Sequence, residues 1–302
     1  MADRSIFCLL PLFIMRAMLT QIIFNGLIAG SAYSLIALGY TMIYGVGRLI
    51  NFAHGELYMG AAYCFFLFYI QLDWNIYSSF FGAILIGALL GIALERIAYR
   101  PFKESSRLIP LITTIGASTF LKAVAILFFG VQAKTLLKYA YFQPSFDFLG
   151  ATLTPVQGYT LISSLGLMAL LALVLKRTRF GKAIRATAED RISASHLGID
   201  TDEVTSITFA IGGLLAAVAG ILVGYDQNIT PTMGILAGFK GFTAAVLGGI
   251  GNIPGAVIGG FCIGLAENLG AAYLSSANKD SISFAILLLI LLFKPSGILG
   301  KK

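Results

Sequence analysis

The sequence predicts an all-α, polytopic membrane protein with about eight transmembrane helices. Of the 302 residues, 58% are hydrophobic and only 12% are charged, a balance outside the range of soluble domains. The charges gather in short segments between apolar runs of roughly 20 residues, the length that crosses a bilayer. The 34 glycines favour close helix crossings and broken or re-entrant helices.

The apolar runs set the order of the elements. Residues 1–20 are assigned to an N-terminal leader whose role the sequence leaves open. Arg4 followed by a short apolar stretch resembles a signal peptide, but no small-residue cleavage site follows it. Residues 21–300 are expected to form a single transmembrane domain. Its spans are expected at residues 22–46, 57–72, 78–98, 109–131, 159–175, 203–224 and 281–293.

Two segments interrupt this pattern. Residues 47–60 contain polar side chains without a turn-rich linker and are expected to form a break between spans. Residues 226–274 contain GGIGNIPG between apolar pieces that are each short for a full span. A broken or re-entrant helix followed by a tilted span is expected there, because proline and glycine interrupt helical hydrogen bonding.

The longest charged segment, residues 176–200, reads KRTRFGKAIRATAEDRISASHLGID. Its charges exclude it from hydrocarbon, and the positive-inside rule places it in the cytoplasm with the basic loop at residues 99–107. We expect one surface helix over about residues 181–196, a stop at Gly198 and a helix cap at Asp200 or Thr201. This helix is either a solvated linker that only sets topology or a docking element for a cytoplasmic partner.

An internal repeat relates two apolar segments. GAILIGALLGIALE at residues 82–95 aligns with GAVIGGFCIGLAE at residues 255–267, and a polar break precedes each copy. Glycine and alanine match easily by chance in apolar segments. If the repeat is real, two related halves build one pathway, as in many transporters.

Polar groups inside or beside spans are the candidates for a substrate pathway, because an ionised group at bilayer depth costs about 2.5 to 3.5 kcal/mol unless it pairs or faces water. The predicted pathway residues lie at or beside the two breaks: Asn51, His54, Glu56, Asn252 and Glu267. Glu95 and Lys240 are instead expected to extend to the membrane interface.

Several classes of chemistry lack their motifs. The pair Gly181 and Lys182 is followed by Ala183, so the chain has no Walker A motif, and it also lacks HExxH, CxxC and GxSxG. We therefore predict no catalytic residue, no metal site, no cofactor and no ATP hydrolysis by the chain itself. The net charge of +7 is expected to orient the spans and meet anionic membrane lipids, not nucleic acid.

Four motifs in order resemble one transporter family. They are INFAHGELYMGAAY (50–63), ERIAYRPFKESSRLIPLITTIGAS (95–118), ATAEDRISASHLGID (186–200) and GFKGFTAAVLGGIGNIPGAVIGG (238–260). Over nearly all of residues 21–300 the chain resembles the LivH-type permeases of branched-chain amino acid ABC importers, found in the cell inner membrane.

The resemblance implies alternating access driven by partners. These are a LivM-like second permease subunit, two ATP-binding subunits similar to LivG and LivF, and a periplasmic substrate-binding protein. It implies leucine, isoleucine or valine as substrate, and it makes residues 176–200 the coupling loop that inserts into a groove of the ATP-binding subunit. The loop positions to which this role is assigned are Gly181, Arg185, Ala188, Glu189, Asp190, Leu197 and Gly198.

Other functions stay open from the sequence. Related permeases carry urea, short amides or other amino acids. A stand-alone transporter driven by an ion gradient would also use broken helices and intramembrane carboxylates. It would have no need of a helical docking loop, and that feature separates the two. A membrane enzyme lacks a convincing set of acid, base and nucleophile.

Overall fold

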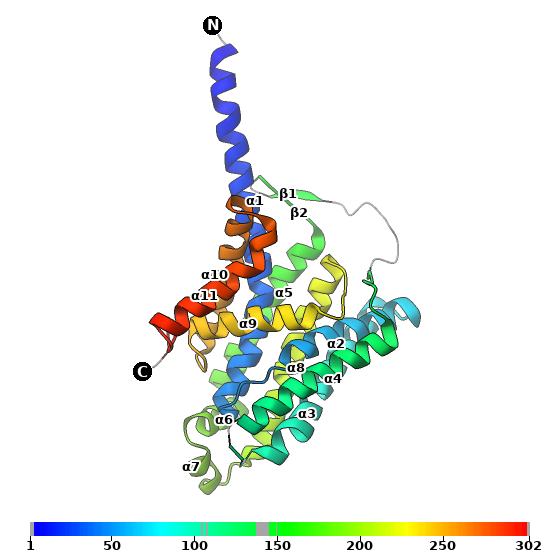
Figure 1. Cartoon of the computed structure of the whole chain (residues 1–302), viewed down its shortest axis with the longest axis vertical. Coiled ribbons are helices and arrows are strands. Elements are labelled where there is room, and N and C mark those ends of the chain that lie inside the picture. The colour runs from blue at the N-terminus through cyan, green and yellow to red at the C-terminus, as the bar shows by residue number, and fades with distance from the viewer. Residues whose placement is uncertain (1–2, 104, 107, 137–144, 149, 301–302) are drawn as a thin grey trace.

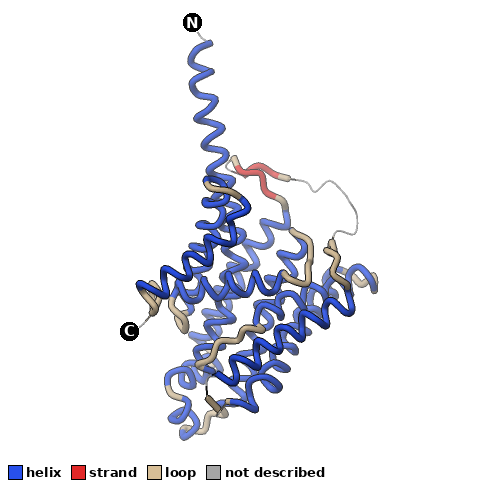
Figure 2. The backbone as a smooth tube through the Cα atoms, in the orientation of Figure 1, coloured by secondary structure: helices blue, strands red, loops and turns tan. Residues whose placement is uncertain are grey.

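The computed structural model describes residues 3–103, 105–106, 108–136, 145–148 and 150–300, and they form a bundle of helices (Figures 1 and 2). A small antiparallel hairpin consists of β1 (Phe146–Phe148) and β2 (Ala151–Leu153). The α-helices are α1 (Asp3–Gly47), α2 (His54–Phe66), α3 (Ile76–Leu94), α4 (Leu108–Phe129), α5 (Pro155–Arg177), α6 (Arg179–Glu189), α7 (Arg191–His196), α8 (Thr201–Asp226), α9 (Met233–Gly248), α10 (Ile253–Tyr273) and α11 (Lys279–Phe293). The all-α prediction is confirmed.

The membrane-length helices agree closely with the expected spans. Among the described residues, seven helices are long and apolar enough to cross a membrane: 17–47, 76–102, 108–129, 155–177, 201–226, 253–273 and 276–293. Two shorter helices, α2 and α9, lie among them, and α2 continues as a π-helical turn to Gln71. The prediction of about eight transmembrane helices thus corresponds to seven full spans and two short ones.

Two predicted boundaries are wrong. The break after α1 covers only residues 48–53, so His54 and Glu56 lie in the first turn of α2 and not in a linker. The single surface helix expected over residues 181–196 is two helices, because Asp190 adopts an extended backbone and its side chain caps the start of α7. Residues 3–20 are the first part of the continuous helix α1, and a separate leader stays a prediction.

The segments between helices gather at two opposite ends. At one end Arg48 donates to the Ala188 carbonyl at 2.6 Å, and the Tyr99 hydroxyl donates to the Gly47 carbonyl at 3.2 Å. At the other end Lys134 and Ile229 exchange backbone hydrogen bonds of 2.9 and 2.8 Å. The first end holds the two basic segments, for which the positive-inside rule predicts the cytoplasmic side.

Helices α1 to α4 and α8 to α11 form two sets that pack crosswise. Helices α2 and α3 pack against α8, whereas α9 and α10 pack against α1. The two repeat segments lie in α3 and α10, and their glycines make these close contacts: Gly87 and Gly91 against α8, and Gly260 and Gly264 against α1. A single membrane-length helix, α5, lies between the two sets. The second set therefore enters the membrane from the side opposite to the first, as in inverted transporter repeats.

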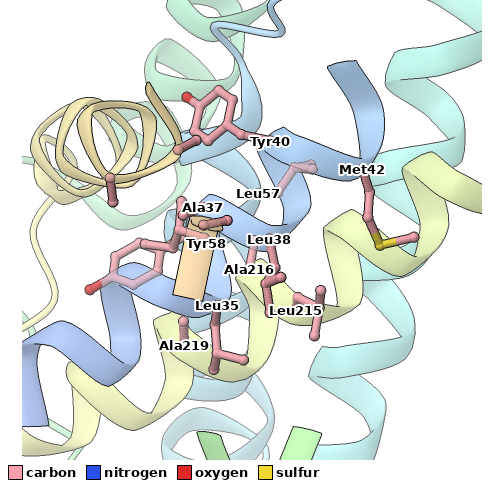
Figure 3. Packing of buried hydrophobic residues seen from close by; sticks show 14 of the residues in the cluster. Leu35, Ala37, Leu38, Tyr40, Met42, Leu57, Tyr58, Leu215, Ala216 and Ala219 are labelled. Carbon is pink, nitrogen blue, oxygen red and sulfur yellow. The ribbon is translucent and has the colours of Figure 1, made fainter. Parts of the chain in front are cut away.

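The core lies where α1, α2 and α8 meet (Figure 3). Leu35 and Leu38 of α1, Leu57 of α2 and Ala216 of α8 are fully or almost fully buried there. Without a hydrophobic driving force inside lipid, such helices associate through close packing, which small residues permit. This core fixes α2 between the two long helices and so positions its first turn.

The expected break at GGIGNIPG is confirmed between α9 and α10. Gly249 and Gly251 have φ angles of 100° and 92°, in the left-handed region that glycine adopts without steric cost. The C-terminal tail packs onto this break, since Ile298 donates its N–H to Leu247 at 2.8 Å and Leu299 donates to Gly248 at 3.2 Å. The chain therefore covers the exposed end of α9 with its own tail.

Candidate functional site

A cleft of about 300 Å³ lies where the α1–α2 break meets the start of α9. Its volume is at the lower end of the roughly 300–1,000 Å³ typical of small-molecule sites. Most of the wall is aromatic or aliphatic, and the hydroxyls of Ser118 and Thr119 from α4 add polar groups. The lining residues are Tyr40, Phe52, Ile115, Ser118, Thr119, Gly234, Ile235, Gly238, Phe239 and Phe242.

Glu56 stands directly behind this wall. Its side chain is only 1% exposed, and Oε1 accepts a hydrogen bond of 3.1 Å from the Ser118 hydroxyl. Oε2 has no hydrogen-bond partner among the described residues, and a Cβ added to Gly234 would come within 2.7 Å of it. The carboxylate thus faces the cleft across a glycine that presents no side chain.

Asn51 and His54 shape the same break from within. The Asn51 side chain accepts a hydrogen bond of 3.1 Å from the Ala53 N–H and so holds the turn before α2. The His54 ring is completely buried, 4.7 Å from the Tyr40 ring, against Gly39, where any Cβ would overlap it. The structure therefore brings three predicted pathway residues together behind the cleft wall, and none of the three lines the cleft itself.

The other two predicted pathway residues lie elsewhere. Glu267 of α10 is fully buried and accepts hydrogen bonds from Tyr33 at 2.9 Å, from Lys240 at 3.1 Å and from Ser283. Asn252 caps α10 by accepting from Gly255 at 3.2 Å and donates to the Leu299 carbonyl at 2.6 Å. Neither residue lines the cleft, and a pathway role for them stays a prediction.

Two expected interface residues are buried instead. Lys240 of α9 is 9% exposed and pairs with both Glu267 and Asp280 at 3.0 and 2.7 Å, so it does not extend to the membrane surface. Glu95 is almost fully buried and accepts from the Ser206 hydroxyl at 2.7 Å. Both predictions were wrong because hydropathy along one helix does not show which partners the neighbouring helices supply.

The second candidate surface is the cytoplasmic loop of α6 and α7. Its buried face is small and apolar, with Gly181 packed so tightly against Leu175 that a Cβ would overlap the backbone. Arg185, Glu189 and Asp190 point into solvent. Ile192 on α7 is 71% exposed and Leu197, directly after α7, is 80% exposed, so two large apolar side chains face water.

The remaining loop positions define the ends of these helices. Ala188 is half-buried, and its carbonyl accepts the Arg48 hydrogen bond. Gly198 follows α7 with a φ of 83°, which confirms the predicted helix stop. The Asp190 carboxylate accepts from the Ser193 hydroxyl and the Ile192 N–H, and these hydrogen bonds hold the pKa of Asp190 below its ordinary value.

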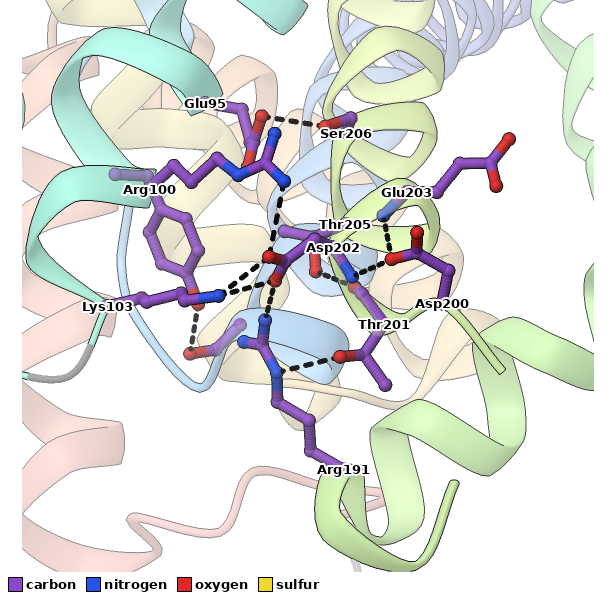
Figure 4. Close-up of polar contacts among 12 residues, drawn as sticks. Glu95, Arg100, Lys103, Arg191, Asp200, Thr201, Asp202, Glu203, Thr205 and Ser206 are labelled. Carbon is purple, nitrogen blue, oxygen red and sulfur yellow. Dashed lines mark hydrogen bonds and ion pairs between the residues drawn. The ribbon is translucent and has the colours of Figure 1, made fainter. Parts of the chain in front are cut away.

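A cluster of charges fastens this loop to the spans (Figure 4). Asp202, at the start of α8, pairs with Arg191 at 2.6 Å, with Lys103 at 2.7 Å and with Arg100 at 3.3 Å. Asp200 caps α8 by accepting from the N–H groups of Asp202 and Glu203, as predicted. Movement of α7 is therefore linked mechanically to α8 and to the loop after α3.

Sequence reasoning missed Asp202 and Ser118. The partners of Asp202 lie up to 102 positions away in the chain, and no local spacing indicates them. A signal for Ser118 was present, because Thr114, Ser118 and Lys122 recur every four residues and mark one polar face of α4. Among the described residues, no group of three His, Cys, Asp or Glu side chains could hold a metal ion.

Comparisons with known proteins agree on one family. A family model described as a branched-chain amino acid transport system permease component matches residues 22–291. The chain is 46% identical to the high-affinity branched-chain amino acid transport system permease protein LivH of Salmonella typhimurium, over 93% of this chain and 95% of that protein. It is 42% identical, over the same shares, to the permease protein BraD of Pseudomonas aeruginosa. It is 29% identical to a probable LivH of Methanocaldococcus jannaschii, over 93% and 92% of the two chains.

Proposed function

This chain belongs to the family of branched-chain amino acid transport system permease components, and from that membership we propose that it moves leucine, isoleucine or valine as one permease subunit of an ABC importer. It is a multi-pass protein of the cell inner membrane. The energy comes from ATP hydrolysed by partner subunits, and the permease performs no chemical step of its own.

The exposed α6–α7 loop supports this proposal most directly. Two large apolar side chains, Ile192 on α7 and Leu197 directly after it, are exposed to water, and Arg191 at the start of α7 is fixed by its ion pair with Asp202. Exposed apolar side chains rimmed by polar ones mark protein interaction sites. A transporter driven by an ion gradient has no need of such a surface, whereas a permease driven by a separate ATPase requires one.

The partners are proposed from the family membership, to which the exposed loop adds support for the ATP-binding subunits alone. Two ATP-binding subunits dock on the cytoplasmic loops, of which α6–α7 is one. A LivM-like second permease subunit supplies the other half of the pathway, and a periplasmic binding protein delivers the amino acid at the opposite face. The cleft between α1, α4 and α9 is the part of the pathway that this chain contributes.

The decisive experiment changes only the docking face. Ile192→Glu with Leu197→Glu places two charges where the partner would bury apolar side chains, and uptake of radiolabelled leucine is measured in vesicles that contain all the subunits. We expect loss of both ATP-dependent uptake and co-purification of the ATP-binding subunits. The matched control is Leu274→Glu, because Leu274 is 74% exposed at the far end of α10.

The outcomes separate the two classes of transporter. Normal membrane insertion with loss of uptake and of co-purification in the double variant alone supports ATP-driven import. Leucine uptake that persists without ATP, or without the ATP-binding subunits, would show that the chain transports by itself and would refute the proposal.

A further inference from the structure

The unpaired oxygen of Glu56 is one of the buried polar atoms that the transport proposal leaves unexplained. A carboxylate that is buried with one oxygen lacking a partner is costly, unless a cation or a donor completes its hydrogen bonding. Glu56 is 1% exposed, and the only hydrogen-bond donor that it meets among the described residues is Ser118. Lys122 acts on this carboxylate as a nearby positive charge, yet no described residue donates to Oε2, so one more donating group fits there.

The direction of the carboxylate identifies where that group would come from. Oε2 lies against Gly234, and Gly234 forms part of the cleft wall. Ser118 donates to Oε1 and also lines the cleft, so this hydrogen bond fixes the position of the carboxylate relative to the cavity. Gly234 is in the first turn of the short helix α9 and has no side chain to cover Oε2 on the side of the cleft.

The remaining wall matches the rest of a branched-chain amino acid. Ile115, Phe239 and Phe242 present aliphatic and aromatic surface to the cavity. The start of α9 lies in the same wall, and the first N–H groups of a helix have no partner within the helix, so they attract a carboxylate. Discontinuous helices in other transporters use their N-termini in this way.

We propose that this cleft binds the amino acid during its passage, with the substrate ammonium group paired to Glu56 and the branched side chain against Ile115, Phe239 and Phe242. The inference rests on the proposed function and adds the recognition chemistry to it. Ser118 is a positioning residue, because it orients the carboxylate through a hydrogen bond without contacting the substrate ammonium. Ligands without an ammonium group lose the ion pair and bind weakly.

Equilibrium binding of radiolabelled leucine tests this directly. The assembled complex is reconstituted in lipid nanodiscs without the binding protein and without ATP. For Glu56→Gln we expect leucine affinity to fall at least tenfold, with a smaller loss for Glu56→Asp, since the shorter side chain keeps its charge. Unlabelled leucine should compete, whereas 4-methylpentanoate, which is leucine without its ammonium group, should not.

Two further variants on α4 test the position of the site. Thr119→Phe fills the cleft from an exposed lining position and should abolish leucine binding. Ile112→Phe enlarges a side chain that is 65% exposed on the same helix outside the cleft, and should bind leucine like the wild type. Co-purification with the partner subunits shows that each variant is folded.

The results distinguish failure of this inference from failure of the proposed function. Wild-type affinity in Glu56→Gln, equal competition by 4-methylpentanoate, or no leucine binding by a complex that transports leucine would each overturn the inference alone. Conversely, leucine binding that depends on Glu56 in a complex without ATP-driven uptake would uphold the cleft and refute the ABC proposal.

Discussion

Lys240 connects the short helix α9 to three neighbouring helices, α1, α10 and α11, and its loss should destabilise the bundle more than any other single charge removal near it. Its ammonium lies 3.0 Å from Glu267 and 2.7 Å from Asp280, and 3.3 Å from the Tyr33 hydroxyl. Glu267 is fully buried, whereas the Asp280 side chain is 49% exposed. We expect Lys240→Met to leave the Glu267 carboxylate buried without its cation.

The structure ranks three substitutions by free energy of unfolding. Lys240→Met should cost about 3 to 5 kcal/mol, the usual effect of removing one partner of a buried pair. Glu267→Gln should cost less, because Lys240 keeps Asp280 as a partner. Asp280→Asn should cost under about 1 kcal/mol, since its side chain is half-exposed. The double variant Lys240→Met with Glu267→Gln should be more stable than Lys240→Met alone, because no unpaired charge remains.

Reversible unfolding of the purified protein by sodium dodecyl sulfate in mixed micelles measures these differences, with the helical circular dichroism signal as the readout. A loss of about 3 kcal/mol changes the unfolding constant by roughly two orders of magnitude, which is well resolved. The reasoning is refuted if Lys240→Met unfolds at the same detergent fraction as the wild type, or if the double variant is the least stable of all the variants. Either result would mean that the pair contributes little to holding α9.

Three other expectations follow from particular contacts. Gly264→Ala should cost about 1 to 3 kcal/mol in the same assay because its Cβ would overlap the α1 backbone, whereas Gly116→Ala, with open space around it, should be neutral. Asp202→Asn removes the anion that three cations share. ATP-dependent leucine uptake should fall about tenfold while membrane insertion stays normal. Unchanged uptake would contradict the mechanical link between α7, α8 and the loop after α3. Hydrogen exchange should show that α7 loses protection below about pH 4. The ionised Asp190 carboxylate caps this helix, its lowered pKa keeps it ionised above that range, and the cap is lost when the carboxylate is protonated. Equal protection at pH 3 and pH 6 would exclude this role.

The sequence by itself determined the membrane class and most span positions. Hydropathy adds up along a single helix, so a run such as residues 203–224 predicts a span whatever surrounds it. The breaks at residues 48–53 and 249–252 were also detectable, because polar residues, glycine and proline interrupt the apolar pattern locally. The Asp200 cap and the Gly198 stop are local in the same sense.

Only the tertiary structure decided which polar groups meet. Glu56 and Ser118 are 62 positions apart, and Tyr33 and Glu267 are 234 apart. Such contacts depend on how each helix is rotated and where two helices cross, and neither quantity is encoded in the hydropathy of one segment. For that reason Lys240 was mistaken for an interface residue, and Asp202 gave no signal at all. The cleft itself lies where Gly234 and Gly238 let the first turns of α9 pack closely against Gly55 of α2.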